Sequence, residues 1–510
     1  MSQRKAGTLL SYLYIIVTNT ISLFYTPYML QTMGQSEYGL YGTASSFISY
    51  LSVLSFGIGG AYIRFNAKAR AAGDKDEERR LNGMFLTVFG ILSLVVLIVG
   101  ILLIALAGQL VEETFTSEEI FKLQIIMLIL IFNMMITFIC NVFMMALQAY
   151  EQFFFIRIVL LVSGIIQPIV NVMALSIGGR SITITFISFI VSLLSYLVMF
   201  IYARKVIQFE VIFSGFEKSV FKEIFIFSGF LFLNSITDQI TFSTDNVILS
   251  AVGGTTVVAV YNVGSSFKVY FQSFSTSISS VFAPQVNQLA VQRRPMKELD
   301  DIFTRVGRIQ FYIVSLVLIG YCTIGYDFVC LWAGKNYSDS FYIGLLLMLA
   351  VAIPSFQNVG LEIQKAMNKH KARSIAYFFV ALFNVFMTIP MSIRWGGIGA
   401  AAATAICMFI GYTGFMNYYN YKYLGMNIPA FWKSIFSILP GYVPTIIICI
   451  LIYYFWNIDS FQDILLAAIV ISIVFILSVW KFSMNDYERE LTMKPIWKIL
   501  KTMGIYKKVK

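Results

Sequence analysis

The segment 34–58, GQSEYGLYGTASSFISYLSVLSFGI, recurs later in the chain without insertions or deletions. Its counterpart at 254–278 reads GTTVVAVYNVGSSFKVYFQSFSTSI and lies 220 residues further on. Eight positions are identical: Gly34, Tyr41, Ser45, Ser46, Phe47, Tyr50, Ser55 and Ile58 match Gly254, Tyr261, Ser265, Ser266, Phe267, Tyr270, Ser275 and Ile278. A weaker echo pairs Gly178 with Gly396. We therefore expect two structurally related halves.

The composition of the surrounding chain indicates a membrane protein. Of its 510 residues, 58% are hydrophobic and only 12% are charged, about half the charged fraction of an average soluble domain. So few charges cannot cover the surface of a soluble chain of this length. The composition argues against a soluble enzyme, a nucleic-acid-binding protein and a disordered chain. A β-barrel is also disfavoured, because its strands alternate polar and apolar residues, whereas the apolar runs here are continuous.

The apolar runs predict fourteen transmembrane helices, since a helix needs about 20 apolar residues to cross a bilayer. The predicted spans are 8–30, 38–60, 83–107, 122–148, 155–177, 182–203, 223–252, 256–282, 309–332, 341–361, 374–393, 398–420, 434–456 and 463–481.

The basic residues predict the orientation of these spans. If the N-terminus is cytoplasmic, the inner segments hold 32 of the 37 Lys and Arg residues. Only Arg180, Lys335 and Arg394 fall in outer loops. By the positive-inside rule, both termini are expected in the cytoplasm.

The repeat and the spans together predict an all-α integral membrane architecture. The 220-residue offset covers six predicted helices, and an even number places both copies in the membrane in the same orientation. Two parallel six-helix lobes would then enclose a central cleft, as in many transporters. The predicted parts are an N-terminal lobe at 1–222, a C-terminal lobe at 223–433, two extra helices at 434–481 and a basic cytoplasmic tail at 482–510.

Four polar residues of the predicted helix at 223–252 form a candidate binding surface. The spacing i, i+4, i+7, i+11 aligns them on one helix face: Asn234, Asp238, Thr241 and Asp245. Polar groups are costly in hydrocarbon, so a stripe of this kind indicates a functional site. The two carboxylates, Asp238 and Asp245, are also candidates to bind a coupling cation, Na⁺ or H⁺.

Lys268 lies near the middle of the next predicted helix, roughly 20 Å below the outer turn, at about the depth of Asp238. Two interpretations stay open. Lys268 could form a buried ion pair with Asp238 or Asp245 that only fastens helices together. Alternatively, it faces a wet cleft and meets an anionic group of a substrate, with the carboxylates holding it in place. Asn19 and Arg64 are predicted to line the same cleft from the N-terminal lobe.

Residues for catalysis or for a metal site are scarce. The five cysteines contain no CxxC pair, and His370 is the single histidine. There is no phosphate-binding GxxxxGK[ST] loop and no HExxH motif. We therefore expect no enzymatic activity, no bound metal and no cofactor other than the possible coupling ion.

The passage 27–65, PYMLQTMGQSEYGLYGTASSFISYLSVLSFGIGGAYIRF, resembles the lipid-linked oligosaccharide flippases of the polysaccharide or O-antigen type. These belong to the MOP superfamily, which also contains multidrug extruders and peptidoglycan-precursor flippases. The segments ALQAYEQF at 146–153 and WGGIGAAAATA at 395–405 are similar as well.

This resemblance implies an alternating-access flippase in a bacterial cytoplasmic membrane. Its substrate would be an undecaprenyl-diphosphate-linked oligosaccharide moved from the inner to the outer leaflet for cell-surface polysaccharide synthesis. The two helices after the second lobe would help to form a groove for the lipid tail. The expected partners are this substrate, membrane lipid and a polysaccharide polymerase or export machinery, and we expect a monomer. The alternatives are a cation-coupled multidrug extruder of the same superfamily and, in another class, a membrane-embedded polymerase or lipid-sugar transferase.

Overall fold

The computed structural model describes residues 3–55, 58–214, 218–292, 294–367, 369 and 371–492. His370 and the last part of the predicted tail, from residue 493, lie outside the described residues.

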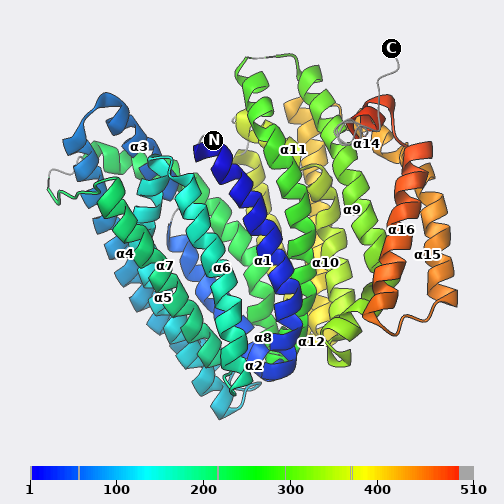
Figure 1. Ribbon diagram of the computed structural model, residues 1–510, viewed down its shortest axis with the longest axis horizontal. Helices are drawn as coiled ribbons and strands as arrows, with labels where there is room; N and C mark the ends of the chain where they lie inside the picture. Colours follow the sequence, from blue (N-terminus) through cyan, green and yellow to red (C-terminus); the bar gives the residue numbers. More distant parts are fainter. Residues whose placement is uncertain are drawn as a thin grey trace, which may run out of the picture. The chain divides into compact units, whose positions relative to one another are not determined.

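The described chain is built from helices, and none of its residues belongs to a strand. The first half contains α1 (Gln3–Met33), α2 (Gln35–Ser49), α3 (Ile58–Ala72), α4 (Lys75–Leu110), α5 (Ser117–Ala149), α6 (Phe153–Ser176), α7 (Ser181–Val206) and α8 (Lys218–Val291). The second half contains α9 (Met296–Trp332), α10 (Asp339–Phe356), α11 (Asn358–Ala366), α12 (Lys371–Met408), α13 (Met416–Tyr419), α14 (Ile428–Phe436), α15 (Val443–Phe455) and α16 (Phe461–Phe482). Figure 1 shows their course through the molecule.

Twelve helical segments among the described residues are long and apolar enough to cross a membrane. The prediction of an all-α, multi-pass membrane protein is thereby confirmed. Two of the twelve segments, residues 235–279 and 371–424, span 45 and 54 residues. Each is about twice the length that one crossing requires.

Both long segments turn back on themselves at a glycine. Asn246 donates a hydrogen bond to Asn262 over 2.8 Å, although 16 residues separate them along α8. In a straight helix that separation would be about 24 Å. The helix is broken between them at Gly254, and α12 is broken in the same way at Gly396. The outer turns predicted at 253–255 and 394–397 therefore fall on these two glycines.

The glycines of the sequence repeat share an unusual backbone conformation. Gly34 has φ 85° and ψ 165°, and its counterpart Gly254 has φ 75° and ψ −174°. This region is essentially restricted to glycine, because a Cβ atom clashes there. In the weaker echo, Gly178 and Gly396 also have positive φ. The local geometry thus supports the repeat that the sequence indicated.

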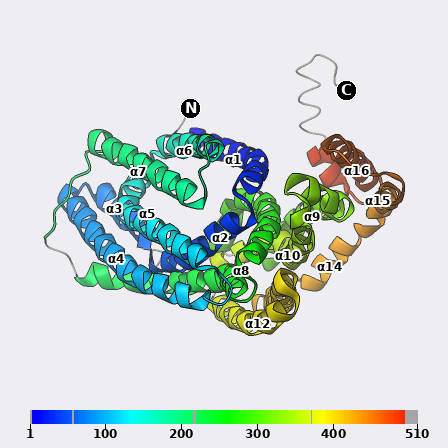
Figure 2. The ribbon, with the colours of Figure 1, turned by 90° about the horizontal axis from the view of Figure 1, so that it is seen from below.

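The first compact unit comprises residues 1–263 and 374–404. Within it, α5 packs against α4 and α7, and α1 lies along α6 (Figures 1 and 2). Its core is rich in aromatic residues, with Tyr62 edge-on to Phe85 at 5.0 Å between ring centroids. Large apolar side chains such as Ile98 on α4 are exposed, as expected of a surface that faces lipid.

The second compact unit comprises residues 264–373 and 405–510, and α9 is its central helix. The helices α10, α14, α15 and α16 all contact α9. The last two, α15 and α16, run side by side (Figures 1 and 2). The bounds of the two compact units differ from those of the two predicted lobes, whose limits stay a prediction.

A buried ion pair fastens the segment after α16 to the second unit. Arg308 of α9 donates to Glu488, and their side chains are 7% and 3% exposed. The guanidinium also donates to the carbonyl oxygens of Ser434 at 2.7 Å and Ser483 at 3.0 Å. Part of the predicted cytoplasmic tail is therefore packed against α9 and α14.

We expect Gly254→Ala and Gly34→Ala each to destabilise the protein by about 1–3 kcal/mol, because alanine is strained in their backbone conformation. Gly90→Ala is the matched control, since Gly90 is helical and a Cβ there would meet open space. It should be neutral or slightly stabilising. Thermal unfolding in detergent measures the three variants, and equal melting temperatures would contradict the assignment of the glycine turns.

We expect Glu488→Ala to destabilise the second unit by about 3–5 kcal/mol, because it leaves the buried Arg308 charge uncompensated. The double variant R308M/E488L should recover most of that stability. Glu362→Ala breaks the exposed pair with Lys365 and should change stability by less than about 1 kcal/mol. Thermal unfolding again provides the measurement, and a double variant as unstable as E488A would contradict this account.

Candidate functional site

A buried carboxylate lies where the two glycine-centred hairpins of the first unit meet. Asp245, on the first arm of α8, is 2% exposed and accepts hydrogen bonds from the hydroxyl groups of Tyr261 and Thr404. Tyr261 comes from the second arm of α8, and the bond from Thr404 of α12 is 2.9 Å long. Gly254 reverses the chain, and this reversal brings Tyr261 to Asp245.

Two further side chains of α12 extend this network. The Asn384 amide donates to the Thr404 hydroxyl at 3.2 Å, and Thr388 donates to the Asn384 amide oxygen at 3.3 Å. All five residues are at most 3% exposed, and we call them the Asp245 cluster: Asp245, Tyr261, Asn384, Thr388 and Thr404. Hydrogen bonds in such a chain polarise one another, and each is stronger in a low-dielectric interior than in water.

A second polar layer connects α2 to both arms of α8. The amide nitrogen of Asn246 donates to the hydroxyl of Ser46 at 2.9 Å and to the amide oxygen of Asn262 at 2.8 Å. One turn further along, Ser49 donates to Ser243 at 2.9 Å. Interhelical hydrogen bonds of this type hold membrane helices together where hydrophobic burial gives little driving force.

Glycines allow α2 to approach α8 this closely. A Cβ atom at Gly39 would lie 1.9 Å from the carbonyl oxygen of Thr255, and one at Gly42 would lie 1.9 Å from the amide nitrogen of Asn262. Neither distance is physically possible. Small residues at the contact are typical of tight packing between membrane helices, so α2 forms one wall of the polar region.

The predicted polar stripe on α8 falls into two environments. Thr241 and Asp245 are buried, and the Thr241 hydroxyl donates to the carbonyl oxygen of Thr237 at 2.8 Å. Asp238, two turns away from Asp245, is exposed. The side chain of Asn234 lies outside the described residues. The structure thus buries the part of the stripe nearest the hairpin turn and exposes Asp238, although the four residues were predicted to share one helix face.

The other predicted cleft residues lie on α1, on α3 and on the second arm of α8. Lys268 is 6% exposed and belongs to the second compact unit. Its pairing with Asp238 or Asp245 stays a prediction. Asn19 on α1 is exposed, and so is Arg64 on α3, whose guanidinium lies 5.8 Å from the centre of the Phe65 ring.

Sequence reasoning did not assign Tyr261, Asn384 or Thr404 to the site. Tyr261 carried a signal, since it matches Tyr41 in the repeat. Asn384 is a single amide inside an apolar run, which is itself an indication of function or packing. Thr404 lies in a run of alanines and carried no signal, because only the hairpin places it beside Asp245.

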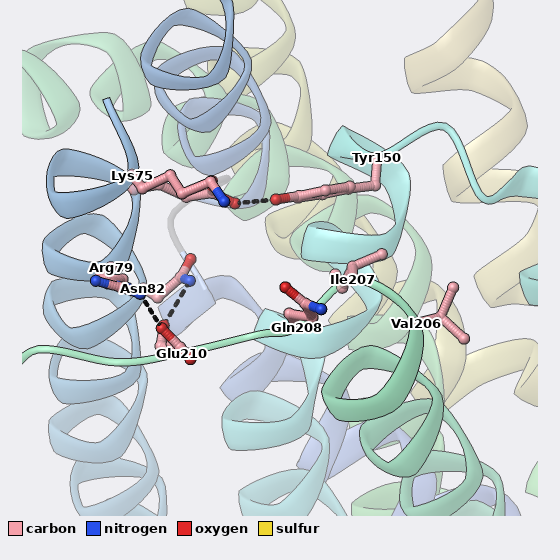
Figure 3. A pocket seen from close by; sticks show the side chains of 9 residues that line it. Lys75, Arg79, Asn82, Tyr150, Val206, Ile207, Gln208 and Glu210 are labelled. Atoms are coloured by element: carbon pink, nitrogen blue, oxygen red, sulfur yellow. Dashed lines mark hydrogen bonds and ion pairs between the residues drawn. The ribbon is translucent and has the colours of Figure 1, made fainter. Parts of the chain in front are cut away.

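A separate polar pocket of about 330 Å³ lies between the start of α4, the end of α5 and the segment after α7 (Figure 3). Tyr150 donates to Glu78 at 2.6 Å, and the Asn82 amide donates to the carbonyl oxygen of Glu210 at 2.8 Å. Arg79 pairs with Glu210. Burial and the Glu78 carboxylate raise the pKa of Tyr150 to about 12, so its hydroxyl stays protonated at neutral pH.

The contacts in this pocket fasten the segment between α7 and α8. The backbone NH of Ile212 donates to the carbonyl oxygen of Arg79 at 3.0 Å, so the segment runs along α4. The acidic groups, Glu78 and Glu210, are already bonded to protein partners. We therefore regard this pocket as a structural joint and the Asp245 cluster as the candidate functional site.

In the described part of the chain, no group of three or more His, Cys, Asp or Glu side chains is placed so that it could hold a metal ion. The Asp245 cluster instead offers a single carboxylate with hydroxyl and amide partners. Hydrogen bonds to the charged form of a carboxylate favour that form.

The described helices define a multi-pass integral membrane protein. The structure described as "Lipid II flippase MurJ, inward closed conformation" matches with a TM-score of 0.73 at 17% identity, over 96% of this chain and 100% of that one. An "inward-facing conformation of a multidrug resistance MATE family transporter of the MOP superfamily" matches with a TM-score of 0.61 at 14% identity, over 81% of this chain and 99% of that one.

Sequence comparison identifies the family. The family model described as "Polysaccharide biosynthesis protein" matches residues 5–290, more than half of the chain. The protein belongs to this family. It is also 20% identical over 497 residues to the "Uncharacterized membrane protein EpsK" of Bacillus subtilis (strain 168), over 93% of this chain and 94% of the relative.

We expect Asp245→Leu to lower the stability of the protein by roughly 1–3 kcal/mol, because it removes the acceptor of the buried Tyr261 hydroxyl and leaves Thr404 only its longer bond to Asn384. Asp245→Asn should keep most of the stability, since an amide oxygen can accept the same bonds.

The matched control for this prediction is Asp238→Leu, the same substitution on the same helix at an exposed position. It should leave the melting temperature in detergent unchanged or raise it, because leucine is favourable against lipid. If D238L is as destabilising as D245L, the hydrogen bonds of the Asp245 cluster do not contribute specially to the stability of the protein.

Proposed function

We propose that the protein is a flippase that moves an undecaprenyl-diphosphate-linked oligosaccharide from the inner to the outer leaflet of a bacterial cytoplasmic membrane. The observation that carries this proposal is a carboxylate network buried inside the apolar helices of a polysaccharide biosynthesis family member. Ionisable groups inside a membrane are rare, and they usually mark a transport pathway.

The physical need for such a protein is clear. A sugar head group and a diphosphate cannot cross hydrocarbon unaided, since even one charge at the bilayer centre is costly. A pathway that shelters the head group while the tail stays in lipid removes this barrier. Because the cell interior is negative, outward movement of an anion is favourable. The gain is roughly 2.3 kcal/mol for each charge and each 100 mV of membrane potential.

The proposed topology has fourteen crossings. Counting each arm of the two long hairpins as a crossing gives two spans more than the twelve apolar segments. The basic segments then lie on the cytoplasmic side with both termini, and the two six-helix lobes, 1–222 and 223–433, alternate in opening to either side.

We assign three residues to distinct tasks in this mechanism. Lys268 contacts the diphosphate of the substrate. Asp245 couples transport to a proton or Na⁺ through the change in charge of its carboxylate, and Asp238 is the second candidate for that ion. Lys268 is well buried in this conformation, so the mechanism requires that alternation exposes it to the head group.

The last two helices favour a lipid-linked substrate over a small drug. The flippase structure covers 96% of this chain, whereas the multidrug transporter covers 81%. The outward surfaces of α15 and α16 expose large apolar side chains, including Ile450 and Leu465, which suits contact with a polyprenyl tail. A multidrug extruder is the alternative within the superfamily.

Depletion of the protein in its host should cause lipid-linked oligosaccharides to accumulate in the inner leaflet, where they are inaccessible to a membrane-impermeant sugar-oxidising reagent. Restored expression should reverse the accumulation. If the lipid-linked units reach the outer leaflet at the normal rate after depletion, the flippase proposal is wrong. Increased sensitivity to drugs without this accumulation would support the extruder instead.

We expect Lys268→Ala to reduce the rate of flipping in proteoliposomes by at least roughly tenfold, about 1.4 kcal/mol of lost interaction with the diphosphate. Lys268→Arg should keep most of the rate because it retains the charge. Lys335→Ala, at an exposed position, is the control. A K268A protein that is present in normal amounts and flips at the wild-type rate would remove Lys268 from the mechanism.

A further inference from the structure

A second pocket, of about 450 Å³, lies within the second compact unit between α9, the start of α10 and the end of α15. Its volume falls in the range of roughly 300–1,000 Å³ that is usual for small-ligand sites. Neither the repeat nor the polar stripe pointed to it. None of the residues that line it belongs to the Asp245 cluster.

One wall of this pocket is a group of tyrosines held in place by a buried phenylalanine. Phe341 is 8% exposed, and its ring lies 5.8 Å from that of Tyr326 and 5.1 Å from that of Tyr342. Tyr326 and Tyr342 themselves are more than 40% exposed. Phe341 thus fixes one edge of each ring, while much of the ring surface stays accessible.

The opposite wall comes from the end of α15. Tyr453 lines the pocket and is 71% exposed, and Trp456 follows at the end of the helix. Aromatic rings on two sides of a pocket of this size provide flat apolar surfaces on which the ring of a ligand can stack.

Both hydrogen-bond donors and hydrogen-bond acceptors line the pocket together with these aromatic rings. Asp327 contributes a half-buried carboxylate, and no ion pair involves it in the described part of the chain. Asn457 offers both a donor and an acceptor. The Thr323 hydroxyl donates to the carbonyl oxygen of Ile319 at 2.8 Å, which leaves its oxygen able to accept.

We propose that this pocket binds the pyranose rings of a saccharide. A sugar ring has an apolar C–H face that stacks on Tyr or Trp, and a rim of hydroxyl groups that both donate and accept hydrogen bonds. An ammonium group could use the aromatic rings and Asp327, but it accepts no hydrogen bond and so makes no use of the Asn457 donor. A phosphate is disfavoured, since Asp459 adds its negative charge near Asp327.

The saccharide pocket deepens the proposed function and rests on it. In the proposed orientation the loops at 333–338 and 457–460 face outwards, so the pocket lies at the outer end of the molecule. It adjoins α15, which is proposed to guide the lipid tail. A sugar head group that has crossed the membrane would bind here before release into the outer leaflet.

The test measures binding of free sugars to the purified full-length protein in detergent by saturation-transfer difference NMR. The probes are N-acetylglucosamine, its trimer chitotriose, choline chloride and inorganic pyrophosphate. We expect the two sugars to bind and the other two probes not to bind. Tyr453→Ala should weaken chitotriose binding by roughly tenfold, about 1.4 kcal/mol, and Asp327→Asn should also weaken it.

Tyr454→Ala is the matched control, because Tyr454 is the next residue, is equally exposed at 73% and does not line the pocket. It should change chitotriose binding by less than about twofold. Equal effects of Y453A and Y454A would mean that these tyrosines are only an interfacial aromatic belt. Such equal effects would overturn the proposal. Binding of choline in place of the sugars would also overturn it, and so would the absence of binding by either sugar.

A flipping assay separates this proposal from the proposed function. If the wild-type protein flips a lipid-linked oligosaccharide but no sugar binds at Tyr453, the saccharide pocket is wrong and the flippase stands. If sugars bind and Y453A abolishes the binding, but no flipping occurs, the pocket stands and the flippase is wrong.

Discussion

The absence of water inside a bilayer is the constraint on which this structure depends. Every polar group in the hydrocarbon region must find its partner within the protein, and hydroxyl groups on two other helical arms donate to Asp245. These partners are in reach because Gly254 and Gly396 reverse their helices. The hairpins, the close approach of α2 and the buried carboxylate are therefore one connected feature of the first unit.

The same constraint separates structural from functional polar groups. Arg308 and Glu488 are as deeply buried as Asp245, but each satisfies the other, and several further acceptors surround the guanidinium. Such a closed network stabilises a fixed arrangement of α9, α14 and the segment after α16. In the Asp245 cluster two hydroxyl groups donate to one carboxylate, so a change in its charge would alter the network. We propose Asp245 for transport coupling and Arg308 for anchoring.

The class of fold could be predicted from the sequence, because apolar composition and helix length are properties of short segments of the chain. The apolar runs, the glycine turns at 253–255 and 394–397 and the repeat of Gly34 in Gly254 are all present in the structure. The candidate site was predicted only in part. The sequence placed Asp238, Thr241 and Asp245 on one face of α8, whereas the structure buries Thr241 and Asp245 and leaves Asp238 exposed.

The sequence by itself determined the helices, their apolar surfaces and the positions of their reversals, since each follows from residues that are neighbours in the chain. Only the tertiary structure decided which side chains meet. Thr404 is 159 residues from Asp245, and nothing in its alanine-rich surroundings marks it as a partner. The aromatic pocket between α9, α10 and α15 also joins residues from distant helices. Such contacts depend on how the helices pack, and helix packing is not encoded in any local pattern.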